Sequence, residues 1–317
     1  MMIDLDHAIQ TRFRQAGNIL IVCHVRPDGD AIGALLGLGL ALQAAGKTVQ
    51  MVSNDGIPAS FRHLPGSDQV KKEPQDGFDL FVTVDCADFK RLGSQFERFR
   101  NPDINIDHHI TNAQFGELNL IEPQAVATCA ILTDHLPRWG LTISPEVAAN
   151  LATGIITDTL GFRTSNTTPA ALRQAALLME TGIDLPELYN RALVRRSYAA
   201  AKYWGAGLSS LTTLDGIVYG TLRIADRKNA GYGGNDDADL INIISAIEDH
   251  QVGMVFVEQP DSVKISWRAL QPEIDVAQVA TAFGGGGHKA AAGADIPGKL
   301  EEIQPRVLAV TREILKL

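Results

Sequence analysis

The sequence predicts an α/β protein, with a doubly wound, mainly parallel sheet followed by a smaller α/β domain. Two observations support this prediction. In the first half, short apolar runs alternate with longer helical patterns, as a parallel sheet requires. Beyond about residue 210 the pattern changes to closely spaced strands. The length of 317 residues is sufficient for two domains that each bury a core.

Four apolar runs in the first half fit buried strands. Each is short, contains valine or isoleucine, and ends in acidic, imidazole or other polar residues. Such runs are typical of parallel strands that are covered on both faces. The expected strands span residues 18–24, 47–55, 79–88 and 104–109.

Helices are expected between and after these strands. The pattern at 31–47 is apolar along most of its length and closes near a glycine suited to a carboxyl-terminal cap. A later helix has Ser144 as its N-cap and Pro145 at its first position. Another repeats this design with Thr168 and Pro169 and closes at Gly182. We therefore assign the first part of the chain to one doubly wound domain.

The domain boundaries are expected where the composition changes. Residues 1–190 form the first domain, and the basic, aromatic segment 191–209 is a helical linker. Residues 210–317 form the second domain, in which consecutive strands are expected to pair antiparallel. These strands are expected at 216–224, 251–259 and 263–270, with a helix at 238–249 among them.

Composition excludes several classes of protein. No apolar run reaches the roughly 18 residues that a membrane helix needs, and the amino terminus lacks the pattern of a secretory signal, so we expect a cytoplasmic protein. The net charge of −9 disfavours binding to long duplex nucleic acid. A short anionic substrate fits if a bound cation supplies positive charge. A homodimer is compatible with these features.

Four clusters of acidic and histidine side chains stand out. Ligands of open α/β sheets bind beyond the carboxyl ends of the strands, where residues far apart in sequence can meet. We therefore expect these clusters to form one metal site. Their members are His24, Asp28 and Asp30 after the first strand, Asp85 after the third, Asp107, His108 and His109 after the fourth, and Asp158 at the end of a helix.

Each cluster also has a simpler interpretation. The DxD turn of Asp28 and Asp30 is more often loop capping than metal binding. Asp85 can simply end a strand. Asp158 is harder to explain in this way, because a carboxylate at a helix carboxyl terminus faces the negative end of the dipole and needs a positive partner. The four clusters together favour metal binding.

The donor types limit the choice of metal. Side chains alternate in direction along a strand, so Cys23 and Cys86 should turn away from His24 and Asp85 and pack in the core. The remaining donors are carboxylates and imidazoles, which suit Mn²⁺ or Mg²⁺ and also accept Co²⁺, iron or zinc. We expect two divalent ions that share one carboxylate, about 3.5–4 Å apart, and activate a bridging water.

A run of four glycines, Gly284 to Gly287, precedes His288. Such a run can be a flexible hinge, or a place where the backbone approaches a ligand closely, and its spacing alone does not decide between them.

The ordered motifs resemble those of a known family. The stretches "HVRPDGDAIG", "VTVDCAD", "INIDHH" and "TGIITDT" resemble the motifs of the DHH phosphoesterases, and "FGGGGHKAAAGA" resembles the signature of the associated DHHA1 domain. The resemblance implies that Asp85 bridges two ions and that His109 contacts the scissile phosphate, while Asp107 orients the site. It implies that one ion is held by His24, Asp28 and Asp85, and the other by Asp30, Asp85, His108 and Asp158.

The same resemblance suggests substrate contacts in the second domain. Arg268 and His288 are implied as partners of a terminal phosphate or base. Arg163 is a weaker phosphate candidate that can equally be a surface residue. The implied glycine contacts are Gly285, Gly286 and Gly287.

Length and the type of second domain resemble those of the compact bacterial oligoribonucleases, or nanoRNases. This implies hydrolysis of short oligoribonucleotides to nucleoside 5'-monophosphates, removal of the 3'-phosphate from 3'-phosphoadenosine 5'-phosphate (pAp), or both, with Mn²⁺ as the expected metal. One alternative is a phosphodiesterase for linear or cyclic dinucleotides such as pApA or c-di-AMP. Another is a nonenzymatic nucleotide- or RNA-binding module, because similar C-terminal domains occur in alanyl-tRNA synthetases.

Overall fold

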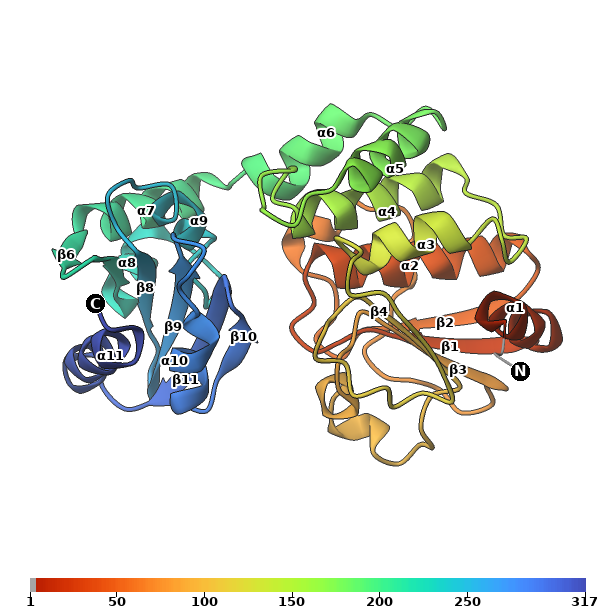
Figure 1. The fold of residues 1–317 in the computed structure, drawn as a ribbon, viewed down its shortest axis with the longest axis horizontal. Helices are drawn as coiled ribbons and strands as arrows, with labels where there is room; N and C mark the ends of the chain where they lie inside the picture. The colour runs from red at the N-terminus through yellow and green to blue at the C-terminus, as the bar shows by residue number, and fades with distance from the viewer. Residues whose placement is uncertain (1–3) are drawn as a thin grey trace. The chain divides into compact units, whose positions relative to one another are not determined.

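Five parallel strands form the sheet of the first unit in the computed structural model, which describes residues 4–317 (Figure 1). Their spatial order is β2-β1-β3-β4-β5. All four strand pairs are parallel, so the predicted parallel sheet is confirmed. The strands are β1 (Asn18–Val22), β2 (Thr48–Val52), β3 (Leu80–Val84), β4 (Ile104–Asp107) and β5 (Leu118–Ile121), the last of which the sequence analysis did not predict.

The two faces of this sheet are covered differently. Ile19 and Ile21 of β1 belong to the large core formed with the helices, whereas Leu20 and Val22 belong to a phenylalanine-rich cluster on the other face. The helices are α1 (Leu5–Gln15), α2 (Gly29–Ala44), α3 (Thr128–His135), α4 (Pro145–Asp158), α5 (Pro169–Met179) and α6 (Leu185–Tyr189). Short 3-10 turns lie at Ala59–Phe61, Ser67–Gln69, Phe89–Leu92 and Ser94–Phe96, and a π-helical turn at Asn190–Val194.

The two predicted N-caps, Ser144 and Thr168, are confirmed. The Ser144 hydroxyl accepts a hydrogen bond from Val147 N at the start of α4, and Thr168 accepts one from Ala171 N at the start of α5. Helix α2 begins two residues earlier than expected, because Asp28 caps it.

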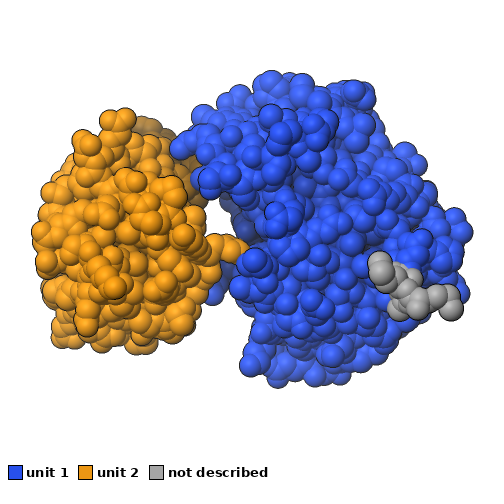
Figure 2. Space-filling view, viewed as in Figure 1, with its two compact units in different colours: residues 1–195 blue, residues 196–317 orange. Residues whose placement is uncertain are grey.

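A six-stranded mixed sheet forms the second unit, in the order β10-β11-β9-β8-β7-β6. The chain divides after Arg195, and Figure 2 colours the two units separately. The strands are β6 (Thr212–Leu214), β7 (Ile217–Leu222), β8 (Val252–Glu258), β9 (Ser262–Ala269), β10 (Gly286–His288) and β11 (Ala291–Pro297). The helices are α7 (Tyr198–Ser209), α8 (Ile224–Ala230), α9 (Leu240–Ile244), α10 (Val276–Ala282) and α11 (Leu300–Leu315).

One strand pairing differs from the prediction. β7 and β8 are parallel, not antiparallel, because α8 and α9 lie between them in the chain and provide the crossover that a parallel pair needs. β8 and β9 are antiparallel as predicted, and Gln259 N donates to Ser262 O across the expected turn.

The segment assigned to a linker contributes to the second core. Ala200 and Tyr203 of α7 are buried in a cluster with β7, β8 and α9. Only the short stretch before Tyr198 therefore connects α7 to the first unit. Among the helices of residues 4–317, none is both long and apolar enough to cross a bilayer.

Candidate metal centre

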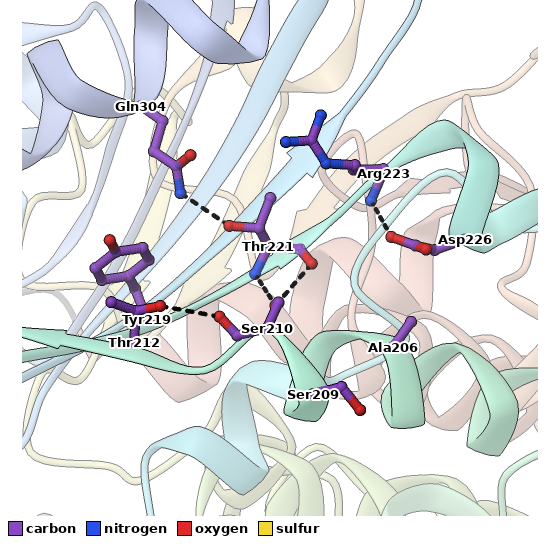
Figure 3. A pocket seen from close by; sticks show the side chains of 9 residues that line it. All are labelled: Ala206, Ser209, Ser210, Thr212, Tyr219, Thr221, Arg223, Asp226 and Gln304. Atoms are coloured by element: carbon purple, nitrogen blue, oxygen red, sulfur yellow. Dashed lines mark hydrogen bonds between the residues drawn. The ribbon is translucent and has the colours of Figure 1, made fainter.

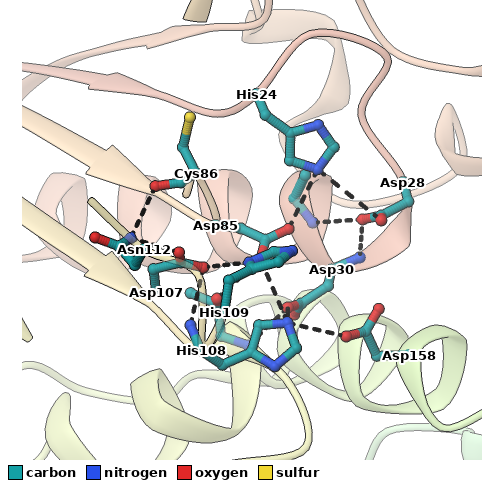
Figure 4. A network of polar contacts seen from close by, with 12 residues as sticks. His24, Asp28, Asp30, Asp85, Cys86, Asp107, His108, His109, Asn112 and Asp158 are labelled. Atoms are coloured by element: carbon teal, nitrogen blue, oxygen red, sulfur yellow. Dashed lines mark hydrogen bonds and ion pairs between the residues drawn. The ribbon is translucent and has the colours of Figure 1, made fainter. Parts of the chain in front are cut away.

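The first unit gathers eight predicted site residues at one edge of its sheet (Figure 4). They come from the carboxyl ends of β1, β3 and β4, the start of α2 and the end of α4. Residues more than a hundred positions apart therefore face one another, as expected for an open α/β sheet. The eight are His24, Asp28, Asp30, Asp85, Asp107, His108, His109 and Asp158.

Asp28 combines a structural role with a place at this edge. Its Oδ1 accepts hydrogen bonds from Asp30 N at 3.1 Å and Ala31 N at 3.0 Å, which caps α2. Its Oδ2 lies 3.9 Å from His24 Nε2. The simpler interpretation of loop capping thus accounts for one oxygen, and the other oxygen faces the cluster.

Asp30 is buried and caps a different helix. Its two oxygens accept hydrogen bonds from Thr128 N at 2.6 Å and Cys129 N at 2.9 Å, the first amides of α3. The N-cap position of α3 is Ala127, which has no side-chain acceptor, so a carboxylate from α2 takes that role.

His24 presents one nitrogen to the cluster. Its Nδ1 lies 2.8 Å from the Val25 carbonyl oxygen, and donation to that oxygen leaves a lone pair on Nε2. Nε2 lies 3.4 Å from Asp85 Oδ2. This is the tautomer that a metal ligand requires.

Asp85 occupies the centre of the arrangement. Its backbone has a φ of +52°, a left-handed conformation that aspartate tolerates better than most residues. Oδ2 faces His24, whereas Oδ1 lies 3.7 Å from His108 Nε2 and 3.6 Å from His109 Nδ1. Burial raises the pKa of the Asp85 carboxyl, but His24 and the other imidazoles outweigh burial and hold this pKa well below its usual range.

His108 supplies the positive partner that Asp158 needs. Its Nε2 lies 3.2 Å from Asp158 Oδ2, at the carboxyl terminus of α4. Burial raises the pKa of Asp158 to about 6, although the hydrogen bond with His108 lowers it in part. Burial lowers the pKa of His108, but the hydrogen bond with Asp158 and nearby carboxylates raise it to about 11.

The donor set fits divalent cations. Three groups have donor atoms that all lie within 4.8 Å of one another. Burial, and then the charges of Asp85 and Asp158, raise the pKa of Asp30 well above its usual value. Buried carboxylates crowded in this way are stabilised by a cation, and oxygen and imidazole donors suit Mn²⁺ or Mg²⁺. The groups are His24 with Asp28 and Asp85, Asp30 with His108 and Asp158, and Asp85 with His108 and His109.

Asp107 holds His109 through a buried polar network. Asp107 Oδ1 accepts from His109 Nδ1 at 2.6 Å and from His108 N at 2.9 Å, and its Oδ2 accepts from Asn112 Nδ2. Asn112 Oδ1 in turn accepts from Asn105 Nδ2 at 3.1 Å. The network orients the imidazole of His109 and holds the backbone of His108.

The cysteines lie outside the donor set. Cys86 Sγ donates to Asp88 O and points away from the cluster (Figure 4). Cys23 and Cys129 are completely buried, and burial raises the pKa of all three thiols. Core packing therefore accounts for Cys23 and Cys86, as the alternation along the strands predicts.

Three further side chains at the site were missed by the sequence analysis. Thr128 Oγ1 donates to Asp85 Oδ1 at 3.0 Å, and Asn112 holds Asp107. Arg91 Nη2 lies 3.3 Å from His24 Nδ1. The sequence pattern was built from acidic and histidine residues, so it did not include a threonine or an asparagine. Arg91, six residues after Asp85, was a cation close to an acidic motif and could have been noticed.

Arg268 and His288 belong to one cross-strand row of the second sheet. His288 of β10 pairs with Ala291 of β11, and Ala291 pairs with Arg268 of β9, which pairs with Gly253 of β8. Directly opposite residues of antiparallel strands point to the same face. The row therefore places both basic side chains on one face, and its other two positions are the small residues Ala291 and Gly253.

Acidic residues lie near Arg268. Burial lowers the pKa of the Arg268 guanidinium, and the carboxylates of Asp237 and Asp239 oppose that effect. Its Nη1 donates to the Trp267 carbonyl at 3.1 Å. These neighbours restrain the guanidinium on the sheet.

The glycine run forms a strand edge. Gly286, Gly287 and His288 make up β10, and a Cβ atom on Gly287 would lie 2.4 Å from Ala291 O. A Cβ atom on Gly285 would lie 2.2 Å from Gly293 O. Both glycines therefore allow β10 to pack on β11, whereas Gly286 has open space at its Cβ position.

The remaining features lie apart from these two groups. Arg163 is exposed in the turn after α4, where its backbone N donates to Thr159 O. A pocket of about 510 Å³ opens in the second unit (Figure 3). Its lining includes none of the predicted site residues, and Ser210 and Thr221 in it are engaged in hydrogen bonds within the unit.

Comparison with known families gives two matches. Residues 18–155 match the DHH family, N-terminal domain, and residues 219–316 match the DHHA1 domain. The first match contains three of the four acidic and histidine clusters and ends before Asp158, and the second contains Arg268 and His288.

Individual relatives extend over almost the whole chain. The "Bifunctional oligoribonuclease and PAP phosphatase NrnA" of Thermus thermophilus is 37% identical over 305 residues, covering 94% of this chain and 90% of that protein. An exopolyphosphatase-related protein from Bacteroides fragilis is similar in structure, with a TM-score of 0.91, 25% identity and coverage of 99% and 98%. RecJ from Thermus thermophilus, solved in complex with Mn²⁺, shares the fold at a TM-score of 0.55 and 17% identity, covering 99% of this chain and 54% of RecJ.

Proposed function

The chain belongs to the DHH/DHHA1 family of phosphoesterases, and on that premise we propose that it hydrolyses short oligoribonucleotides and removes the 3'-phosphate of pAp. The products are nucleoside 5'-monophosphates in the first reaction, and AMP with inorganic phosphate in the second. Similarity to the Thermus thermophilus oligoribonuclease and PAP phosphatase supports this choice of substrates.

The observation that carries the proposal is the division of the Asp85 carboxylate between two clusters. Oδ2 faces His24, and Oδ1 faces His108, so one carboxylate can serve two cations. His24 and Asp28 complete the first set of ligands. Asp30, His108 and Asp158 complete the second. Bound divalent ions, for which we favour Mn²⁺ over Mg²⁺ or Co²⁺, would activate water and offset the charge of the reacting phosphate.

We assign the substrate phosphate to His109. Asp107 accepts the Nδ1 proton of His109, which orients the ring and directs Nε2 toward a nonbridging oxygen. Asp107 is fully buried and accepts hydrogen bonds from His108 N, His109 Nδ1 and Asn112 Nδ2, so we assign it the role of positioning this ring.

Recognition of the rest of the substrate is assigned to the second unit. Arg268 and His288 share one face of its sheet, and a guanidinium binds phosphate through its fork of donors. Gly285 and Gly287 keep β10 close to β11. Gly285, Gly286 and Gly287 are the proposed ligand contacts of the glycine run, through their backbone. Arg163 is an additional phosphate candidate, supported only by its exposure near the end of α4.

A substrate panel tests the proposal. The full-length protein is stripped with EDTA, restored with Mn²⁺, Mg²⁺ or Co²⁺, and incubated separately with a 5'-labelled RNA trimer, pAp, pApA and c-di-AMP. We expect turnover of the trimer and of pAp with Mn²⁺, and none in EDTA. Turnover of the dinucleotides alone would favour the signalling phosphodiesterase. Binding of these ligands without turnover by any metal-restored sample would favour a nonenzymatic module.

A further inference from the structure

Thr128 connects two carboxylates that come from different elements. It is the first residue of α3 and is completely buried. Its backbone N donates to Asp30 Oδ2 at 2.6 Å, and its Oγ1 lies 3.0 Å from Asp85 Oδ1. In this contact the hydroxyl of Thr128 donates and the carboxylate oxygen of Asp85 accepts.

The second hydrogen bond bears on the division of Asp85 between its neighbours. Rotation about the bond to a carboxylate group has a broad, roughly two-fold profile, so the side chain alone does not set the plane of its oxygens. His24 contacts Oδ2, and the Thr128 hydroxyl occupies one acceptor direction of Oδ1. Asp85 Oδ1 also lies 3.7 Å from His108 Nε2 and 3.6 Å from His109 Nδ1, so its other acceptor direction remains for the side of these two imidazoles.

We propose that Thr128 is a positioning residue that orients the Asp85 carboxylate for two cations. The inference rests on the proposed function and adds to it a residue outside the proposed set of metal ligands. Its backbone amide orients Asp30 in the same way, so the start of α3 holds one ligand of the second cluster and the ligand shared by both. A carboxylate that is already oriented loses less freedom when it binds cations.

Metal titration of the full-length, EDTA-stripped protein tests this. Isothermal titration with Mn²⁺ compares the wild type with Thr128→Val, which removes the hydroxyl but keeps the backbone amide, and with Thr128→Ser, which keeps both. We expect Thr128→Val to weaken Mn²⁺ binding by about 10–100-fold. Thr128→Ser should bind within about threefold of the wild type, since its hydroxyl can make the same bond.

A matched control is available on the same helix. Thr133 is also buried, and its hydroxyl donates to Cys129 O, one turn back in α3. Thr133→Val therefore removes a buried hydroxyl without touching a site carboxylate, and Mn²⁺ affinity should not change. Melting temperatures of the stripped proteins report any common loss of stability. Thr128→Ala serves as a second variant, because it removes the hydroxyl without placing a methyl group against Asp85.

The outcomes separate this inference from the proposed function. Suppose that the wild type hydrolyses the trimer and that Thr128→Val and Thr128→Ala bind Mn²⁺ as tightly as the wild type does. This result would overturn the role of Thr128 and leave the proposed function intact. Equal weakening by Thr133→Val would also overturn that role, since the effect would then be one of helix stability. A wild type that binds no Mn²⁺ would overturn the proposed function, and this inference with it.

Discussion

The edge of the first sheet and the basic row of the second sheet differ in how much their polar groups are restrained. At the first edge, Asp30, Asp85 and Asp107 are almost inaccessible to solvent. Asp30 and Asp85 accept hydrogen bonds from α3, and Asp107 accepts them from the loop that follows β4. In the row, Arg268 is half-buried and His288 is exposed, beside Ala291. The first region is a buried anionic site held by several hydrogen bonds, and the second is a more exposed basic row in which Arg268 is held by one hydrogen bond and by nearby carboxylates.

This difference separates two functions that a phosphoesterase needs. Crowded, buried carboxylates are costly unless a cation balances them, so the first region is suited to hold metal and carry the chemistry. A basic row with small neighbours can contact phosphates of substrates of different length. Mutations in the first region should therefore lower turnover, and mutations in the second should raise the KM.

The largest effect is expected from Asp85→Asn. This change keeps the shape of the side chain but removes the charge that both clusters share. Turnover of pAp should fall by about a thousandfold or more, with a parallel loss of Mn²⁺ binding. Steady-state kinetics and metal titration measure both effects.

Asp88→Asn is the matched control for Asp85→Asn. Asp88 lies three residues further along the same loop, is exposed, and accepts from Lys90 N. The Asp88→Asn variant should retain wild-type turnover. If Asp85→Asn kept its Mn²⁺-dependent activity, the first region would not be the reaction centre.

A smaller effect of a different kind is expected from Arg268→Ala. Losing a charge-assisted hydrogen bond to phosphate should raise the KM for the RNA trimer by about tenfold and leave kcat nearly unchanged. Lys264→Ala is the control, because Lys264 precedes Arg268 by four positions in β9 and therefore lies on the same face of the sheet. Equal effects of the two changes would mean that general surface charge, not the row, attracts the substrate.

The smallest effect on activity is expected at His135, at the far end of α3. Its Nδ1 and Nε2 contact Asp6 and Glu122, so both nitrogens donate and the ring is an imidazolium. Burial lowers the pKa of His135, but the two carboxylates outweigh burial and raise it. Neither Asp6 nor Glu122 is a predicted site residue. We therefore expect His135→Gln to change the free energy of unfolding and not kcat.

The pH dependence of that change has a defined sign. The pKa of His135 is higher in the folded state than its ordinary 6.5, so its contribution is full below 6.5 and is lost as the pH rises through the folded value. The hydrogen bond from His135 lowers the pKa of Glu122 from 4.5, so that contribution is lost as the pH falls through the folded value of Glu122. Urea denaturation should show His135→Gln destabilised by about 2 kcal/mol near pH 5.5, and less in alkaline solution. An equal difference at both pH values would contradict the ion pairs.

Much of the site follows from local patterns. His24, Asp85 and His108 each end an apolar run, and parallel strands place their carboxyl ends at one edge. The caps at Ser144 and Thr168 also follow from residue type. By contrast, the direction of β7 relative to β8 was predicted incorrectly, because α8 was not recognised and the expected helix at 238–249 was not interpreted as part of a crossover between parallel strands.

The sequence by itself determined which donors are present and at which edge they collect, because the position of each donor directly after an apolar run and the alternation of side chains are local properties. Only the tertiary structure decided how each carboxylate is oriented. Asp30 caps a helix 98 residues away, and Thr128 reaches Asp85 across 43 residues. Such contacts depend on how α2, α3 and β3 pack together, and packing between elements leaves no periodic trace in the chain.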